Sequence, residues 1–311
     1  MKTRLLPVAA LLATLLPAQR QERSQDEYKQ MRAEKLAKEV FKKASWIRDY
    51  DKARETAKQE GKLIFAYFTR SYVPCERCAA LESGPLSDPE FEKFAKSAVL
   101  FLHNTSRVEG DEAYPNLHQE KGFKPFDFPT VCFMDAAGNV LTKPGNSVKS
   151  FLEGHAESTA IVTLRNKGDK ATAAERKQLF LSELKSDLIP AAEIQVRSDR
   201  ITDLSTCEKE LVASKLVDAE VRALFGKGRE LGPEKMRATF AELAKAGKVP
   251  SETLSGPFWR FVLEHASKQK DASLAQKAYD ALMKRYAKET GDKIDSAKQA
   301  WQKLLEDAKA K

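Results

Sequence analysis

Two cysteines separated by two residues are the part of this sequence best suited to chemistry. They occur in the segment Cys75-Glu76-Arg77-Cys78. If this segment begins a helix, residues three apart lie on the same side of its first turn, so the two sulfur atoms are close enough to form a short disulfide loop. The residue types and their spacing therefore favour a redox-active cysteine pair.

A strand before the pair and a helix after it must position the two sulfur atoms. Residues 63–68 form a continuous, aromatic-rich apolar run, which is typical of a buried strand. A short loop over 69–74 follows, and a helix is expected from the cysteines through Leu81. Unpaired N–H groups and the positive end of a helix favour a thiolate at the first cysteine. We therefore expect Cys75 to be solvent-accessible and Cys78 to be covered.

A second group of residues follows about fifty positions later. Phe128-Pro129-Thr130 precedes a predicted strand over 131–134, a turn over 135–139 and a second strand that begins at Val140. Together with the first strand, the helix and the cysteine pair, this hairpin resembles the thioredoxin superfamily. The resemblance covers residues 46–166 and implies an α/β thioredoxin-like fold, in which helices flank a central mixed sheet.

The resemblance also implies roles for individual residues. Cys75 would attack a substrate sulfur and form a mixed disulfide, and Cys78 would resolve it. Pro129 matches the cis-proline of the family, so the bond between Phe128 and Pro129 is expected to be cis. This proline would shape a groove for an extended peptide and keep the sulfur atoms from capturing a metal. Phe128 is expected to contact substrate, with Thr130 next to it in the same site.

Two positions depart from the family pattern. Pro74 stands before the first cysteine, where the family usually has Trp, and Ala66 stands where many members bury an acid that helps to deprotonate the second cysteine. Proton transfer from Cys78 would therefore need water or another base. Between the cysteines, Arg77 favours the thiolate and Glu76 opposes it. We expect Pro74, Glu76 and Arg77 to tune the reduction potential of the pair.

Residues 1–18 have the outline of a secretory signal peptide. Lys2 and Arg4 make a positive start, an apolar run follows, and Ala18 is a small residue at a plausible cleavage point. An uncleaved membrane anchor is the alternative, because Leu16 is a poor residue three positions before the cut. We expect no integral membrane segment in the mature chain, because no other apolar run is long enough.

An exported location, periplasmic or extracellular, permits disulfide chemistry. Residues 46–62 agree with export, because they resemble the secreted thioredoxin-like branch, in which a helix ending in Gly-Lys runs into the central strand. Two further cysteines, Cys132 and Cys207, lie outside the motif. A buried, inert thiol is the favoured interpretation of Cys132, and pairing of Cys132 with Cys207 stays open.

Charge and motifs argue against several other functions. The formal net charge is +8, and it falls to +6 without residues 1–18, which hold two basic residues and no acid. No long basic run with interleaved aromatic residues occurs, so nucleic-acid binding is not expected. Neither a metal nor another cofactor is expected, because no Gly-rich phosphate loop occurs and the histidines show no ligand spacing. These histidines are His103, His118, His155 and His265.

The chain is expected to fold as two domains. Residues 24–45 have the spacing of an amphipathic helix, which either packs on the domain that follows or serves as a spacer. The thioredoxin-like domain is expected over 46–167. Residues 170–311 are rich in Ala, Lys and Glu with helical periodicity, which predicts an all-α domain suited to partner binding or dimerisation. Its later helices are expected at 211–225, 233–246, 257–267, 274–290 and 294–309.

The favoured function is an exported thiol-disulfide oxidoreductase that acts on protein thiols and disulfides and works with an unidentified redox partner. The alternative is a non-catalytic binding module with a structural disulfide, in which the helical domain is the working surface. Pro74 and Ala66 favour the module, whereas the intact cysteine pair and Phe128-Pro129-Thr130 favour the enzyme. Oxidation, reduction and isomerisation of substrate disulfides stay open, because the direction depends on the reduction potential.

Overall fold

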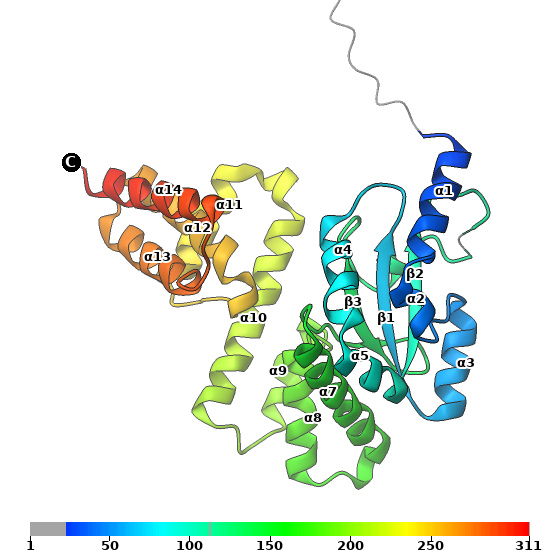
Figure 1. Cartoon of the computed structure of the whole chain (residues 1–311). Coiled ribbons are helices and arrows are strands. Elements are labelled where there is room, and N and C mark those ends of the chain that lie inside the picture. Colours follow the sequence, from blue (N-terminus) through cyan, green and yellow to red (C-terminus); the bar gives the residue numbers. More distant parts are fainter. Residues whose placement is uncertain (1–22, 112, 311) are drawn as a thin grey trace, which may run out of the picture. The chain divides into compact units, whose positions relative to one another are not determined.

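The computed structural model describes residues 23–111 and 113–310, so the predicted signal peptide at 1–18 lies outside the described residues. The chain divides into two compact units, Met1–Gly154 and His155–Lys311. Each unit has an apolar core of its own. Figure 1 shows the helices and strands of the chain. The division falls within helix α7 (Val148–Lys167), and the predicted domain boundaries stay predictions.

The first unit is built on a four-stranded mixed sheet with the strand order β2–β1–β3–β4. The central strand β1 (Leu63–Arg70) pairs in parallel with β2 (Ala98–Thr105). On its other side β1 pairs antiparallel with β3 (Thr130–Met134), which continues into a hairpin with β4 (Val140–Thr142). The predicted α/β class, with a central mixed sheet flanked by helices, is confirmed.

Short helices precede the sheet and connect its strands. They are α1 (Gln25–Leu36), α2 (Glu39–Lys43), α3 (Tyr50–Glu60), α4 (Glu76–Ser83), α5 (Pro89–Phe94) and α6 (Leu117–Glu120), with the 3-10 turns η1 (Pro85–Ser87) and η2 (Ala95–Ser97). The single helix expected over 24–45 is therefore two helices. They separate because the backbone of Lys38 is extended, with φ −60° and ψ 141°.

Strand β1 is buried along most of its length, since helices cover both faces of the sheet. On one face, Ala66 and Phe68 share a cluster with Cys78 and with residues of α3. Because successive side chains of a strand point to opposite faces, the continuous apolar run at 63–68 serves both layers. On the second face, Phe65 lies 5.1–5.5 Å, between ring centroids, from Phe91, Phe94, Phe133 and Phe151.

The second unit is all helical, as predicted. After α7 it contains η3 (Gly168–Lys170), α8 (Ala173–Lys185), α9 (Ala191–Asp199), α10 (Thr206–Gly226), α11 (Gly228–Lys245), α12 (Glu252–Gln269), α13 (Ala272–Arg285) and α14 (Asp292–Lys309). Phe180 and Leu184 belong to one apolar cluster of this unit. Phe258, Trp259 and Trp301 belong to a second cluster, so these three aromatic residues are core residues.

Helix ends in the second unit differ from the sequence pattern in several places. Helix α10 begins at Thr206, ahead of the predicted start at 211, and α13 ends at Arg285, before the predicted end at 290. Helix α11 has a break at Gly232, which has a φ of 73°, a value that glycine adopts readily. Helical backbone resumes at the predicted start, Pro233. Helix α12 begins at Glu252, ahead of the predicted start at Pro257, so this proline lies inside the helix. No helix in the described parts of the chain is long and apolar enough to cross a membrane.

Candidate active site

Cys75 and Cys78 form a disulfide at the start of helix α4. Their Cα atoms are 5.2 Å apart. Cys75 is the N-cap of the helix, and its sulfur accepts a hydrogen bond from the backbone N–H of Cys78 at 3.3 Å. Cys75 is partly exposed, whereas Cys78 is fully buried. The structure therefore confirms the expected difference in accessibility, and it places the exposed sulfur where helix N–H groups favour a thiolate.

The segment Phe128-Pro129-Thr130 lies where β3 begins. The peptide bond between Phe128 and Pro129 is cis, as predicted. Phe128 is buried in the same apolar cluster as Cys78, and Cys75 packs against that cluster. The structure thus brings the cysteine pair and the residue before the cis-proline into one cluster, although they lie far apart in sequence.

The aromatic residues that precede the cis-proline fall into two classes. Phe123 and Phe128 are buried in the cluster that also contains Cys78. Phe126 is instead 67 % exposed, and its backbone is left-handed with φ 66°. Of the three, Phe126 is therefore the one that offers an apolar surface to solvent.

The three residues expected to tune the pair are all exposed: Pro74, Glu76 and Arg77. Among the described residues, neither Glu76 nor Arg77 forms an ion pair. Ala66, at the position where many relatives bury an acid, is fully buried in the same cluster as Cys78. A methyl group therefore stands there in place of a carboxylate.

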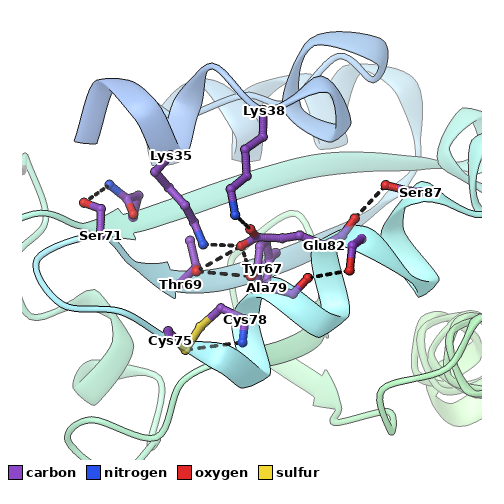
Figure 2. A network of polar contacts seen from close by, with 12 residues as sticks. Lys35, Lys38, Tyr67, Thr69, Ser71, Cys75, Cys78, Ala79, Glu82 and Ser87 are labelled. Carbon is purple, nitrogen blue, oxygen red and sulfur yellow. Dashed lines mark hydrogen bonds and ion pairs between the residues drawn. A yellow bond between two sulfur atoms is a disulfide. The ribbon is translucent and has the colours of Figure 1, made fainter. Parts of the chain in front are cut away.

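A buried carboxylate does occur on helix α4, four residues after Cys78. Glu82 is 2 % exposed and forms ion pairs with Lys35 of α1 and with Lys38, whose Nζ lies 2.7 Å from Glu82 Oε2. The hydroxyl of Tyr67 on β1 donates to Glu82 Oε1 at 2.6 Å. Figure 2 shows these side chains converging on Glu82 beside the helix that carries the cysteines.

The partners of Glu82 decide which protonation state it holds. Burial alone would raise its pKa, but the ammonium of Lys35 and hydrogen bonds from both lysines and Tyr67 outweigh burial, so the pKa of Glu82 is lowered. Burial and the Glu82 charge raise the pKa of Tyr67, which keeps its hydroxyl a donor. Glu82 is therefore held in its ionised form, which ties helix α4 to the two lysines, and it is poorly suited to take the proton of Cys78.

His118 supports the cis-proline segment from behind. Its ring stacks on that of Phe128 with centroids 4.7 Å apart, and its Nε2 lies 3.1 Å from Oγ1 of Thr130. Burial, together with the neighbouring His103, lowers the pKa of His118 to about 4. The ring is therefore neutral at ordinary pH and acts as a packing and hydrogen-bonding group.

The other sites considered from sequence are not assembled. Cys132 is buried and Cys207 is exposed, and both are free thiols. Within the described residues, no group of three or more His, Cys, Asp or Glu side chains is arranged to hold a metal ion. The cysteine pair is thus the redox-capable sulfur site of the described structure.

Sequence reasoning missed several residues that surround this site. Glu82 and Lys35 were not singled out, and His118 was considered only as a metal ligand. The sequence held a signal for Glu82, because residues four apart on a helix share one face. Glu82 therefore shares the buried face of α4 with Cys78 and Leu81. No local pattern identifies Lys35, since its partner lies 47 positions away.

A disulfide-capable pair at a helix start, packed with the residue before a cis-proline, defines a thioredoxin-type redox site. Comparison with known proteins agrees. Residues 45–136 match the protein family described as thioredoxin-like, so this region of the chain is thioredoxin-like. Its fold and its Cys-x-x-Cys motif support a thiol-disulfide oxidoreductase.

Comparison with solved structures and with curated proteins adds little to this family assignment. The chain is similar to a solved structure titled "DsbH Oxidoreductase", with 23 % sequence identity and a TM-score of 0.32. This similarity covers 37 % of the present chain and 83 % of that one. Among curated proteins no match was found.

Proposed function

We propose that this protein is an exported thiol-disulfide oxidoreductase that acts on cysteines of other proteins through Cys75 and Cys78. One observation carries the proposal: the two sulfur atoms are bonded to each other, yet only Cys75 is open to solvent. A purely structural disulfide needs no such difference. Exchange needs it, because one sulfur must meet the substrate and the other must wait behind it.

In the reducing direction, the Cys75 thiolate attacks one sulfur of a substrate disulfide. A bond forms between Cys75 and that sulfur, and the other substrate sulfur leaves as a thiolate. The Cys78 thiolate then attacks Cys75, which forms the observed disulfide and releases the second substrate sulfur. Two electrons pass from the cysteine pair to the substrate, and two protons complete the substrate thiols.

The oxidising direction runs through the same mixed disulfide. A substrate thiolate attacks Cys75 in the disulfide form, and Cys78 leaves as a thiolate. A second substrate thiolate then attacks the substrate sulfur of the mixed disulfide, which returns Cys75 as a thiolate. In either direction, a separate redox protein must restore the cysteine pair after each turnover.

The two cysteines differ in how their thiols lose a proton. Cys75, at the helix start, is stabilised as a thiolate by the helix N–H groups. Cys78 is buried beside the methyl group of Ala66, so its proton must leave through solvent or to the first substrate thiolate released at the site. We therefore expect resolution by Cys78 to be slower than attack by Cys75.

The segment Phe128-Pro129-Thr130 is proposed as the substrate-binding edge, because it starts strand β3 and packs with the cysteine pair. An extended peptide can pair with backbone groups there. Pro74, Glu76 and Arg77 are proposed to tune the reduction potential, because they flank the sulfur atoms and are exposed to the approaching partner.

The decisive experiment traps the mixed disulfide. Cys78→Ser keeps the attacking thiolate and its helix end but removes the group that releases the substrate. This variant should therefore accumulate covalent complexes with partner proteins, visible on a non-reducing gel and lost on reduction. Cys75→Ser should trap none, because the remaining sulfur is buried.

Two further variants serve as controls in the same experiment. Cys132→Ser and Cys207→Ser should behave like the parent protein, because both thiols lie outside the pair. A protein in which neither Cys75→Ser nor Cys78→Ser traps a partner would be a binding module with a structural disulfide, and our proposal would be wrong.

Export is proposed from residues 1–18 and from the compatibility of disulfide chemistry with an oxidising compartment. The periplasm or the extracellular space would provide it. The mature N-terminus tests this point: protein recovered from the exported fraction should begin near Gln19. A full-length protein that keeps residues 1–18 in the cytoplasmic fraction would contradict export without affecting the exchange chemistry.

A further inference from the structure

Three arginines converge on Tyr72, which lies three residues before Cys75 in the loop between β1 and α4. The guanidinium carbon of Arg107 lies 4.4 Å from the centroid of the Tyr72 ring, and that of Arg70 lies 5.8 Å from it. Arg23 donates a hydrogen bond from Nη1 to the carbonyl oxygen of Tyr72 at 3.3 Å. We call Arg23, Arg70 and Arg107 the Tyr72 arginine cluster.

The cluster adjoins both halves of the proposed redox site. Arg70 ends strand β1, and its guanidinium carbon lies 6.0 Å from the ring centroid of Phe128 as well. One cationic side chain therefore contacts the loop that leads to Cys75 and the residue before the cis-proline. A substrate peptide lying on Phe128 with a sulfur at Cys75 would pass close to this charge.

No ion pair neutralises the charges of the cluster within the described structure, although Arg23 acts on the charge of Glu27 at longer range. None of its three arginines forms an ion pair with a described acidic residue. The Nε of Arg70 is buried and has no hydrogen-bond partner among the described residues. Aromatic rings attract a guanidinium but leave its N–H groups unsatisfied. A buried N–H donor without an acceptor is costly. Because this Nε is closed to solvent, an outside acceptor would bind other N–H groups of the cluster.

Two nearby acids are already engaged, whereas Glu109 and Glu76 form no ion pair with the cluster or with another described residue. Asp111, in the same loop as Arg107, forms an ion pair with Arg32 and accepts a hydrogen bond from Ser106. Glu27, near Arg23, accepts hydrogen bonds from Ser24 in the capping box of α1. The three guanidinium groups around Tyr72 are therefore left without an ion-pair partner among the described residues.

We propose that the Tyr72 arginine cluster binds acidic residues that flank the reactive cysteine of the partner protein. This inference rests on the proposed function, because it names the substrate class of the same site. Guanidinium groups pair with carboxylates in a two-point geometry, and a positive patch at a reactive centre raises the encounter rate of acidic partners. The ligand of this cluster is a polypeptide and not a nucleic acid, because Cys75 reacts with the sulfur of a cysteine.

Three synthetic disulfide peptides of equal length test the proposal, with the cysteines flanked by Asp and Glu, by Ser and Gln, or by Lys. Reduced protein should react fastest with the acidic peptide. Arg70→Gln combined with Arg107→Gln should slow that reaction about tenfold and leave the neutral peptide within about twofold. Raising the salt concentration should reduce the preference of the parent protein.

Two control variants test whether the effect comes from misfolding or from a general loss of positive charge. Arg107→Gln alone changes an exposed residue and should lose part of the preference for the acidic peptide. This variant keeps the test valid if Arg70→Gln disturbs folding. Arg48→Gln removes the same charge at an exposed residue without a described contact to Tyr72 or Phe128, and its peptide preference should match the parent. An equal loss for all three peptides would mean that the arginines act on the Cys75 thiolate, which overturns the proposal.

A binding measurement separates this proposal from the proposed function. The acidic peptide with its cysteines replaced by Ser cannot exchange, so its dissociation constant for the disulfide form reports the surface alone. We expect about tenfold weaker binding in the double arginine variant and no change in Arg48→Gln. Exchange without selective binding overturns the acidic-partner inference, and selective binding without exchange overturns the proposed function alone.

Discussion

Lys35 and Glu82 form a buried ion pair between helices α1 and α4, with side chains 8 % and 2 % exposed. Helix α1 lies before the thioredoxin-like match at 45–136, and α4 begins directly after Cys75. The N-terminal segment therefore packs on the redox unit through this pair, as Figure 2 shows, and does not act as a spacer. This contact motivates the first prediction.

Glu82→Gln should strongly destabilise the protein, because it leaves the ammonium of Lys35 buried without its counter-charge. Breaking a buried pair in this way costs about 3–5 kcal/mol of unfolding free energy. Urea unfolding near neutral pH measures the change. Glu39→Gln is the matched control, since Glu39 pairs with Lys42 on the surface. Equal unfolding free energies for Glu82→Gln and Glu39→Gln would contradict a structural role for the pair.

His118 should make the stability depend on pH. Burial holds its pKa at about 4, below the usual 6.5, so the unfolded chain takes up a proton that the folded chain does not. The His118 contribution is thus present above pH 6.5 and is lost as the pH falls toward 4. From about pH 7 to about pH 5 the loss should be about 2 kcal/mol.

The comparison that isolates this effect uses His118→Phe, which keeps a ring against Phe128 but cannot titrate. Its unfolding free energy should fall less over the same pH interval, by the amount attributed to His118. Parallel pH curves for the parent and His118→Phe would show that the histidine is not held neutral in the folded protein.

The four cysteines should differ in their reactivity toward an alkylating reagent. In the disulfide form, only the exposed Cys207 should react, because burial raises the pKa of Cys132 to about 12. After reduction, Cys75 should react before Cys78, and Cys132 should react only on unfolding. Peptide mapping by mass spectrometry gives the order. Faster labelling of Cys78 than of Cys75 would reverse the proposed roles.

Phe126 should contribute to recognition of protein substrates without stabilising the fold, since it is 67 % exposed and lies two residues before Phe128. Phe126→Asn suits the left-handed backbone, and it should lower kcat/KM for a protein substrate about threefold to tenfold. Its unfolding free energy should change little. Val196→Ser, at an exposed apolar residue of the second unit, is the control. Unchanged kcat/KM in Phe126→Asn would exclude a substrate contact.

Short sequence segments were enough to predict the elements that carry the redox site. The apolar run at 63–68, the Cys75-Glu76-Arg77-Cys78 motif and the Phe128-Pro129-Thr130 hairpin each carry their signal within a few residues. The helix start at Cys75 follows from these residues, and the mixed sheet and the cis bond at Pro129 follow from the resemblance to the thioredoxin superfamily that they carry together. Helical periodicity likewise revealed the all-α region, although α12 begins at Glu252, ahead of Pro257, the residue type that favours a first helical position.

Tertiary structure alone decided what surrounds that centre. Glu82 meets Lys35 across 47 positions, and Arg23 reaches Tyr72 across 49. Periodicity reports that a side chain faces inward, but it does not say which distant charge or ring it meets there, because that depends on how loops close between elements. The ion pair of Glu82 with Lys35 and the arginines around Tyr72 therefore became visible only in the folded chain.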